Sequence, residues 1–277
     1  MRIFPEFTIR GVGFALLRIT VASYVLLGLI IYVYQDQMLY FPDQTPFADC
    51  SELADATQVD MNGTRGYFFQ NGTSTKLVVL YPGNGGRACE RAFYRTAIER
   101  AGYSWLFVEY AGYAGDKSKN GEEVTPSTEA ILRDARNVHE WVLLRHPSML
   151  AIFGESIGSG PASYHASFAS PDTLIFIAPL DRLSLRVQEI YPLYPSRLML
   201  KYDFDNITWA QSAKRVLIIH GTGDTIIPIT HGENLFAQLP QVEKEFLAVP
   251  GVDHNESFAL GKTQYAILQF LEKGTLK

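Results

Sequence analysis

The chain has 277 residues, of which 47% are hydrophobic and 19% are charged. This apolar content is sufficient for a sizeable core and excludes a disordered chain. The formal net charge of -5 argues against a nucleic-acid-binding protein, which needs a basic face, and two cysteines are too few for a disulfide scaffold or a zinc site.

Residues 11–34 form an apolar segment whose only charged residue is Arg18. As a helix this segment would be about 36 Å long, against about 30 Å of bilayer hydrocarbon. A cleavable signal peptide would need a small-x-small cleavage site, which residues 32–36 do not offer, and a buried core helix would not stay apolar on every side. We therefore expect an uncleaved transmembrane anchor within residues 1–36, followed by one domain over residues 37–277.

The charges around this segment are distributed unevenly. Three arginines lie before or within it, and the next basic residue along the chain is Arg65. Positively charged flanks stay on the cytoplasmic side of a membrane. We therefore expect a cytoplasmic N-terminus and a domain outside the inner membrane, in a periplasm. The three arginines are Arg2, Arg10 and Arg18.

An oxidising compartment would allow Cys50 and Cys89 to form a disulfide. The alternative is two unrelated buried thiols. The sequence does not show whether their Cα atoms come close enough for a disulfide, and unpaired thiols are slightly favoured.

After residue 36, apolar runs of strand length alternate with longer helical patterns. The runs are rich in β-branched and aromatic residues, which is typical of strands buried on both faces of a parallel sheet, and the alternation predicts a doubly wound α/β fold. Strands are expected at Lys76–Tyr81, Ser104–Glu109, Met149–Phe153, Leu174–Ala178, Val216–His220 and Glu245–Val249. Helices are expected at Arg87–Ala101, Pro126–Arg145, Ile157–Ala169, Thr230–Leu239 and Ser257–Leu271.

Three further segments interrupt or start these elements. An edge hairpin is expected around the turn at Asn62-Gly63. Thr125 is the expected N-cap of the helix that starts with Pro126. Residues 180–214 are too long for a simple connection, and we expect them to form a short lid over the carboxyl ends of the strands.

A Gly-x-Ser-x-Gly motif lies at residues 154–158, between an expected strand and an expected helix. The five-residue pattern alone is weak, but its position is informative. A sharp strand-to-helix turn puts the serine in a strained backbone conformation, and small residues on both sides avoid clashes. Ser156 is therefore the candidate nucleophile.

A serine hydroxyl needs a base and an orienting carboxylate, and these follow in chain order. Asp224 lies just beyond one expected strand and His254 just beyond the next. His220, at a strand end, is the rival base. Asp253 is the rival acid, but its adjacency to His254 would give poor geometry for orienting the imidazole ring.

Two backbone N–H groups are needed to bind the oxyanion of the tetrahedral intermediate. One is expected from Ile157, the residue after the nucleophile, and one from Asn84 in the glycine-rich loop of residues 81–86. A phosphate-binding loop is the alternative for these glycines, but the spacing fits neither dinucleotide nor Walker motifs. No metal and no organic cofactor are implied.

Together these motifs resemble the α/β-hydrolase superfamily, with a mostly parallel sheet. Within it they are similar to membrane-anchored serine hydrolases related to the Bem46 proteins and α/β-hydrolase-domain protein 13. The resemblance starts near Gln37 and implies that the serine, aspartate and histidine form a triad. It departs at Pro82, where relatives often have a histidine that braces the loop, and in residues 112–116, which lack the usual serine or threonine. The matching segments include Met38–Pro42, Gly83-Asn84, Tyr110–Tyr113, Gly154–Gly160, Gly223-Asp224, Ile227-Pro228 and Asp253–Asn255.

The expected activity is hydrolysis of an acyl ester or thioester through an acyl-enzyme, on a small-molecule or lipid-like substrate. A peptidase or amidase using the same triad, and a membrane-tethered binding domain without turnover, are the alternatives. Tyr191 and Tyr194 in the expected lid suggest an apolar acyl group, or equally a lid packed on the core.

Overall fold

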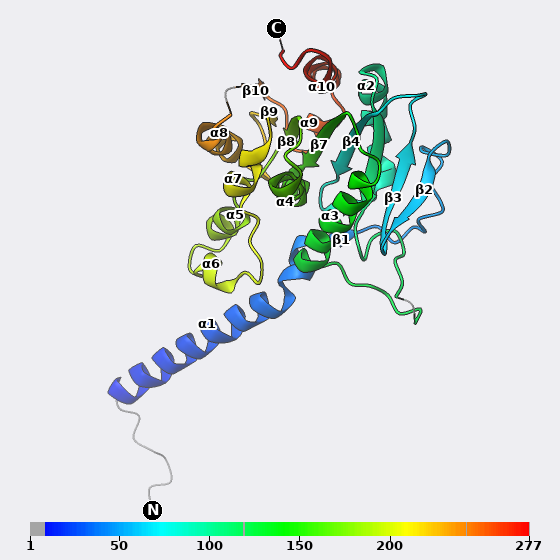
Figure 1. Ribbon diagram of the computed structural model, residues 1–277. Coiled ribbons are helices and arrows are strands. Elements are labelled where there is room, and N and C mark those ends of the chain that lie inside the picture. The colour runs from blue at the N-terminus through cyan, green and yellow to red at the C-terminus, as the bar shows by residue number, and fades with distance from the viewer. Residues whose placement is uncertain (1–8, 119, 242, 277) are drawn as a thin grey trace, which may run out of the picture.

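The computed structural model describes residues 9–118, 120–241 and 243–276, so Arg2 lies outside the described residues. A long N-terminal helix, α1 (Ile9–Leu39), precedes a domain in which helices cover both faces of a central sheet (Figure 1). Eight strands form this sheet in the order β10-β9-β8-β7-β4-β6-β3-β2. The predicted fold class, an α/β-hydrolase fold with a mostly parallel sheet, is confirmed.

All six predicted parallel strands are present in the sheet. They are nearly continuous runs of apolar residues because both faces of the sheet are covered. The expected edge hairpin also forms, with its turn at Asn62 and Gly63 and antiparallel pairing between its strands. The strands are β2 (Thr57–Met61), β3 (Thr64–Phe69), β4 (Lys76–Tyr81), β6 (Ser104–Glu109), β7 (Met149–Glu155), β8 (Thr173–Ile177), β9 (Arg215–Gly221) and β10 (Glu243–Val249).

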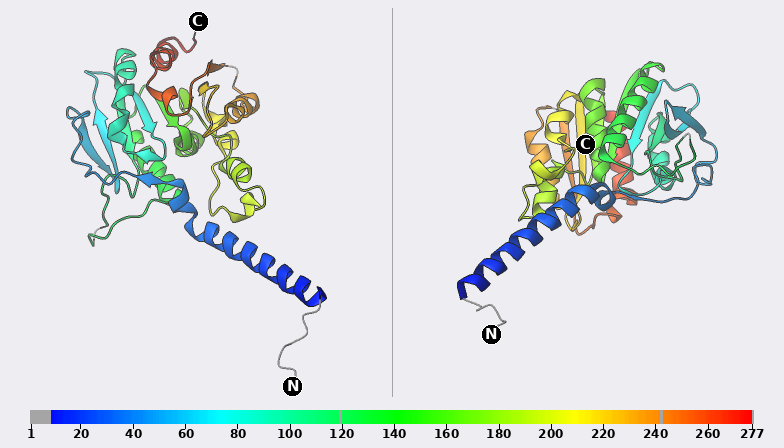
Figure 2. Two further views of the ribbon diagram at one scale, coloured as in Figure 1. Left: turned by 180° about the vertical axis from the view of Figure 1, so that it is seen from behind. Right: turned by 90° about the horizontal axis from the view of Figure 1, so that it is seen from below.

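Two hydrophobic clusters lie on opposite faces of the sheet, because successive strand residues point to opposite sides. Val79 belongs to one cluster and its neighbours Val78 and Leu80 to the other. The first face is covered by α3 (Thr128–Leu143), α4 (Ser159–Ala169) and α8 (Ile229–Gln238). The second is covered by the 3-10 helix η1 (Ala88–Tyr94) with α2 (Arg95–Arg100), and by α9 (Glu256–Ala259) with α10 (Gly261–Lys273). Figure 2 shows the two layers of helices from behind and from below.

Helix boundaries differ from the predicted ones in three places. The predicted N-cap Thr125 is wrong: the side chain of Ser127 accepts a hydrogen bond from the backbone N–H of Ala130 at 3.2 Å, so α3 begins at Thr128. The helix predicted over residues 87–101 starts as a 3-10 helix. The helix predicted over residues 257–271 is interrupted at Leu260, where ψ is 138°.

Helix α1 extends five residues beyond the predicted apolar segment, to Leu39, and projects away from the domain (Figures 1 and 2). Its apolar side chains are mostly exposed, and only 6% of its most apolar window is buried. Among the described residues it is the helix that is long and apolar enough to cross a membrane.

The predicted insertion forms the lid, residues 180–214, with short helices α5 (Leu183–Ile190), α6 (Ser196–Met199), α7 (Asn206–Trp209) and the 3-10 helix η3 (Ala210–Ser212). Its tip does not rest on the domain core. The ring of Tyr194 stacks on the ring of Tyr24 in α1, with 4.6 Å between the ring centroids. The hydroxyl of Tyr24 donates to the carbonyl of Leu193 at 2.6 Å, and the amide of Gln35 donates to the carbonyl of Met199 at 3.2 Å.

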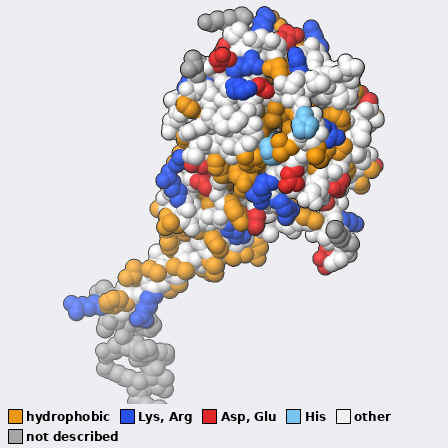
Figure 3. Space-filling model, in the orientation of Figure 1, with side chains coloured by type: hydrophobic (Ala, Val, Ile, Leu, Met, Phe, Trp, Pro, Cys, Tyr) orange, Lys and Arg blue, Asp and Glu red, His pale blue; other side chains and the backbone are white. Residues whose placement is uncertain are grey.

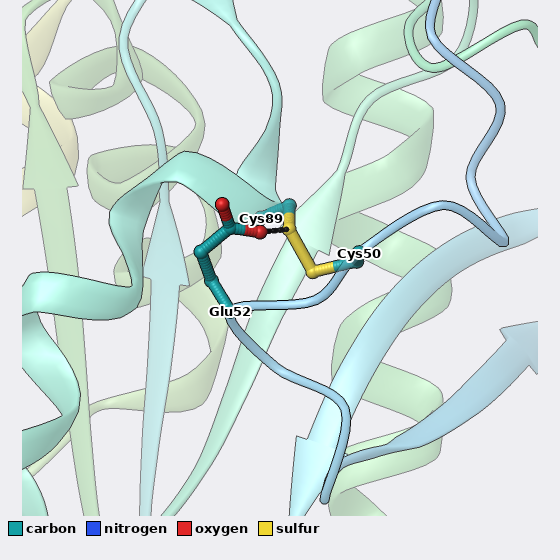
Figure 4. A group of neighbouring side chains, drawn as sticks. All are labelled: Cys50, Glu52 and Cys89. Carbon is teal, nitrogen blue, oxygen red and sulfur yellow. Dashed lines mark hydrogen bonds between the residues drawn. A yellow bond between two sulfur atoms is a disulfide. The ribbon is translucent and has the colours of Figure 1, made fainter.

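The expectation of two unpaired thiols is wrong, because Cys50 and Cys89 form a disulfide with their Cα atoms 5.8 Å apart (Figure 4). Burial of η1 on the sheet brings Cys89 against the segment that follows α1. Glu52 lies beside the bond, with Oε2 3.2 Å from Sγ of Cys89. The two sulfurs are bonded to each other, so this group offers no thiolate to a metal ion.

The disulfide joins residues 39 positions apart. Restricting the unfolded chain over that separation stabilises the fold by about 4 kcal/mol in the chain-entropy model. We expect the double variant Cys50→Ser, Cys89→Ser to have a free energy of unfolding lower by that order, measured by urea unfolding of the full chain in detergent micelles. Adding a reductant should destabilise the wild type and leave the double variant unchanged; equal unfolding midpoints for both proteins would contradict the prediction.

Candidate active site

Ser156 lies in the sharp turn between β7 and α4, at the first residue of the 3-10 helix η2 (Ser156–Gly158). Its φ of 55° is in the left-handed region, which non-glycine residues rarely occupy. The flanking glycines are required by close packing. A Cβ at Gly158 would lie 2.3 Å from the carbonyl oxygen of Pro82, and one at Gly154 would lie 2.7 Å from the Cα of Ser159.

The structure brings Ser156, His254 and Asp224 together at the carboxyl ends of three strands. The Nε2 atom of His254 is 2.9 Å from Oγ of Ser156, and its Nδ1 atom is 2.6 Å from Oδ2 of Asp224. All three residues are buried. The side chains form a continuous hydrogen-bonded chain from a carboxylate through an imidazole to a hydroxyl.

The environment of Asp224 keeps its carboxylate ionised. Burial alone would raise the pKa of Asp224, but hydrogen bonds from His220, His254 and the backbone N–H of Ile227 outweigh it and hold the pKa well below its usual range. The backbone N–H groups of Ile226 and Ile227 donate to Oδ1 at 3.0 and 2.8 Å. An ionised acceptor at Nδ1 favours the imidazole tautomer whose Nε2 can accept the serine proton.

The rival base His220 and the rival acid Asp253 do not take the places of His254 and Asp224. His220 does contact Asp224, with 3.3 Å between Nε2 and Oδ2, and its Nε2 also lies 2.9 Å from the carbonyl oxygen of Ile227. It therefore lies behind the carboxylate, where it supports the acid. Asp253 accepts from the backbone N–H of His254 at 2.7 Å, so it fixes the loop and not the imidazole ring.

Asn84 and Ile157, the expected oxyanion-binding residues, both line a cavity of about 570 Å³ that contains Ser156 and His254. Ile157 is in the first turn of a helix, where backbone N–H groups have no acceptor within the helix. Asn84 precedes the two-residue strand β5 (Gly85–Gly86) in the loop after β4. The loop and the turn therefore face one space beside the serine hydroxyl.

Two residues that the sequence did not single out brace this loop, in which Pro82 stands where the resemblance predicts a bracing histidine. The buried carboxylate of Glu155 pairs with Arg91 at 2.8 Å and accepts from the backbone N–H of Gly83 at 3.3 Å. Arg91 also donates to the carbonyl of Gly85 at 2.9 Å. Glu155 is the first of the two variable residues of the Gly-x-Ser-x-Gly motif and Arg91 is in η1, so only their proximity in the fold identifies them.

The same loop is bonded to the end of α1. The amide of Asn84 donates to the carbonyl of Leu39 at 3.1 Å, and the backbone N–H of Phe41 donates to the carbonyl of Asn84 at 3.0 Å. The strand that follows α1, β1 (Phe41–Pro42), pairs in parallel with β5. Tyr113, from the segment that lacks the usual serine or threonine, donates its hydroxyl to the same carbonyl of Asn84 at 2.7 Å.

The sheet topology described above is that of the α/β-hydrolase fold, and comparisons with solved structures support this fold. Est1E from Butyrivibrio proteoclasticus, solved with ferulic acid bound, superposes with a TM-score of 0.63 and 16% identity, over 78% of this chain and 98% of that one. The Pyrococcus furiosus esterase Pf2001 gives a TM-score of 0.61 and 15% identity, over 85% and 97% of the chains. At these identities the similarity establishes the α/β-hydrolase fold.

Curated relatives narrow the assignment. The uncharacterized protein Rv2307c of Mycobacterium tuberculosis is 30% identical over 252 residues, 86% of this chain and 87% of that protein. YfhR of Escherichia coli K12 is 23% identical over 82% of this chain and 80% of that protein. The α/β-hydrolase domain-containing protein 17B of Xenopus laevis is 29% identical over 65% of this chain and 60% of that protein. No protein-family model matches the chain. The chain belongs to the same family as Rv2307c, and its fold is the α/β-hydrolase fold. The narrower resemblance to the Bem46 proteins stays a prediction.

The buried pair of Arg91 and Glu155 gives a test of the loop bracing. The side chain of Glu155 is 2% exposed, so Arg91→Met leaves an unpaired buried charge and should lower the free energy of unfolding by about 3–5 kcal/mol. Lys214→Met is the matched control: Lys214 pairs with Asp172 at 2.7 Å but is 69% exposed, and its loss should cost about 0–1 kcal/mol. Urea unfolding of both variants measures the difference, and equal costs would refute the bracing role.

Proposed function

We propose that the chain is a serine hydrolase that cleaves an acyl ester or thioester through an acyl-enzyme. The observation that carries this proposal is the hydrogen-bonded chain from Asp224 through His254 to Ser156, on a strained turn beside a cavity. The family relationship supports a hydrolase. The residues in the cavity supply a nucleophile, a base and two backbone donors, which is the set that acyl transfer needs.

The reaction would proceed in two halves. His254 takes the proton of Ser156 as Oγ attacks the acyl carbon, and the N–H groups of Ile157 and Asn84 bind the oxyanion. The imidazolium then gives that proton to the leaving alcohol or thiol as the tetrahedral intermediate collapses to the acyl-enzyme. A water molecule, deprotonated by His254, attacks the acyl-enzyme, and the imidazolium returns that proton to Oγ of Ser156 as the acid is released. Asp224 stabilises the imidazolium in both halves.

The proposal includes a membrane anchor, formed by α1, with the N-terminus in the cytoplasm and the domain outside. The length and apolar surface of α1 support the anchor. Arg10 and Arg18, near the start of the helix, support the orientation. The disulfide between Cys50 and Cys89 supports it independently, since disulfides persist in oxidising compartments.

A fluorophosphonate probe tests the nucleophile directly, because it reacts covalently with an activated serine. We expect the wild type to be labelled and Ser156→Ala to remain unlabelled, as followed by in-gel fluorescence. Equal labelling of the two proteins, or none of either, would leave a membrane-tethered binding domain as the better explanation.

The assignment of the acid is tested by comparing the two candidate aspartates, Asp224 and Asp253. Asp224→Asn should lower kcat for a p-nitrophenyl ester by about 10³–10⁴-fold, since the wrong imidazole tautomer is then favoured. Asp253→Asn is the control, and its kcat should fall by less than about tenfold, because the carboxylate of Asp253 accepts from the backbone N–H groups of His254 and Thr225 and not from the imidazole ring. Thermal unfolding should show both variants folded; an equal loss of kcat would remove Asp224 from its proposed role.

The orientation predicts the behaviour of a reporter fused after the last residue. In a Gram-negative host, an alkaline phosphatase fusion should be active, because this enzyme needs the disulfides that form outside the inner membrane. A green fluorescent protein fusion at the same position is the complementary control and should be dark when exported through the general secretory route. The reverse pattern in well-expressed fusions would invert the orientation.

A further inference from the structure

A second cavity, of about 130 Å³, lies between α1 and the lid, directly beside the active-site cavity. Met38, Leu39 and Ile190 line both cavities, so the two spaces share an apolar wall. The second cavity is otherwise lined mainly by apolar and aromatic side chains, namely Ile31, Val187, Tyr191, Tyr194, Met199 and Leu200.

The two polar residues in this lining already have partners within the chain. The amide of Gln35 donates to the carbonyl of Met199, and its oxygen accepts from the backbone N–H of Lys201 at 2.9 Å. The hydroxyl of Ser196 donates to the carbonyl of Ser184 at 2.7 Å. With these groups satisfied, the cavity suits an apolar ligand.

The contacts between the lid and α1 lie far down the helix. Tyr24 stacks on Tyr194, and it is ten residues before Tyr34, the last residue of the apolar segment. At the rise of an α-helix, ten residues correspond to about 15 Å. If α1 spans a bilayer, the tip of the lid therefore reaches well below the outer surface, into the hydrocarbon of the outer leaflet.

The lid tip carries exposed apolar side chains, and the lid's charged pair with α1 lies nearer the domain. Leu193 is 78% exposed and Leu198 is 82% exposed, and they belong to the same lid tip that stacks on α1, whose own apolar side chains are mostly exposed. Closer to the domain, Nζ of Lys201 lies 3.6 Å from Oδ2 of Asp36 near the C-terminal end of α1, where the membrane–water interface is expected. Figure 3 shows hydrophobic side chains running along α1 and onto the adjoining surface of the domain.

We infer that the tip of the lid, residues 190–199, is immersed in the outer leaflet beside α1, and that the second cavity receives the acyl chain of a membrane lipid. The inference rests on the proposed function and specifies its substrate class, a long-chain fatty acyl ester held in the bilayer. The chain enters between α1 and the lid and passes Met38, Leu39 and Ile190, which places its carbonyl carbon at Ser156. A cavity of about four water volumes holds a segment of such a chain, and the remainder stays in the leaflet.

The depth of the lid is measured with a polarity-sensitive label on the full chain in phospholipid vesicles. Leu193→Cys carries the nitrobenzoxadiazole label, and Leu144→Cys is the control. Leu144 is 79% exposed at the C-terminal end of α3, whereas the other end of that helix, at Thr128, contacts Tyr40 just after α1. Nitroxide-labelled acyl chains should quench the label at residue 193 and leave the label at residue 144 unaffected. Equal quenching at the two positions would overturn the immersion of the lid.

The route of the acyl chain is tested by narrowing the second cavity. Met199→Trp and Val187→Phe add volume from α6 and α5, and Leu198→Trp adds the same indole to the neighbouring exposed position. The readout is kcat/KM for a long-chain ester in vesicles divided by kcat/KM for a water-soluble butyrate ester. This ratio should fall about tenfold or more in the two narrowing variants and stay within about twofold of wild type in Leu198→Trp.

The outcomes separate the two proposals. If both narrowing variants are folded by thermal unfolding and keep the wild-type ratio, the acyl route is wrong although the hydrolase remains. An equal fall in all three variants would also overturn the route, since it would reflect the lid surface and not the cavity. If Ser156→Ala retains hydrolysis of the butyrate ester, the proposed function itself has failed, whatever the ratio shows.

Discussion

The pairing of the chain segment after α1 with the loop after β4 is the constraint on which the rest of the site depends. Leu39 and Phe41 hydrogen-bond to the side chain and carbonyl of Asn84, and β1 continues this contact along β5. From the opposite side, Arg91 and Glu155 hold the same loop from within the domain. The proposed oxyanion donor, the backbone N–H of Asn84, would have to stay close to the oxyanion to be effective, and a loop fixed at two places is pre-organised for such a task. The helix outside the domain is thereby part of the structure that positions the site.

Buried charge in the site is compensated at each point where it occurs. Glu155 is neutralised by Arg91, and Asp224 receives two backbone N–H groups and two imidazoles. The two carboxylates differ in which groups they contact. Glu155 points at the loop after β4 and supports it, whereas Asp224 bonds to the one imidazole that reaches the serine. Two carboxylates near one serine therefore have different roles, which are assigned by their partners and not by their distance along the chain.

Local patterns predicted the features that depend on local physics. The strands follow from short β-branched runs, and the placement of Ser156, Asp224 and His254 follows from their positions just after strands, because parallel strands bring their carboxyl ends to one edge. Contacts between distant segments have no such signal. The loop braces, the disulfide and the stacking of the lid on α1 each join residues that no period or motif relates. Even the N-cap of α3 depended on which of two nearby hydroxyls, at residues 125 and 127, reached the helix end.

The residues of α1 show that its second half is shaped by the lid as well as by apolar surroundings. A Cβ at Gly28 would lie 2.9 Å from Cε1 of Tyr194, so a larger residue there would displace the ring that stacks on Tyr24. Spanning a bilayer requires no glycine at this position, and glycine lowers helix stability. The helix is apolar on every side for two reasons. One face packs against the lid and lines its cavity, and the other faces are exposed, as a membrane-spanning helix requires. The uniform hydrophobicity that predicts a membrane span thus includes the face that packs against the lid, and this face is distinguished by Gly28, Tyr24 and Gln35.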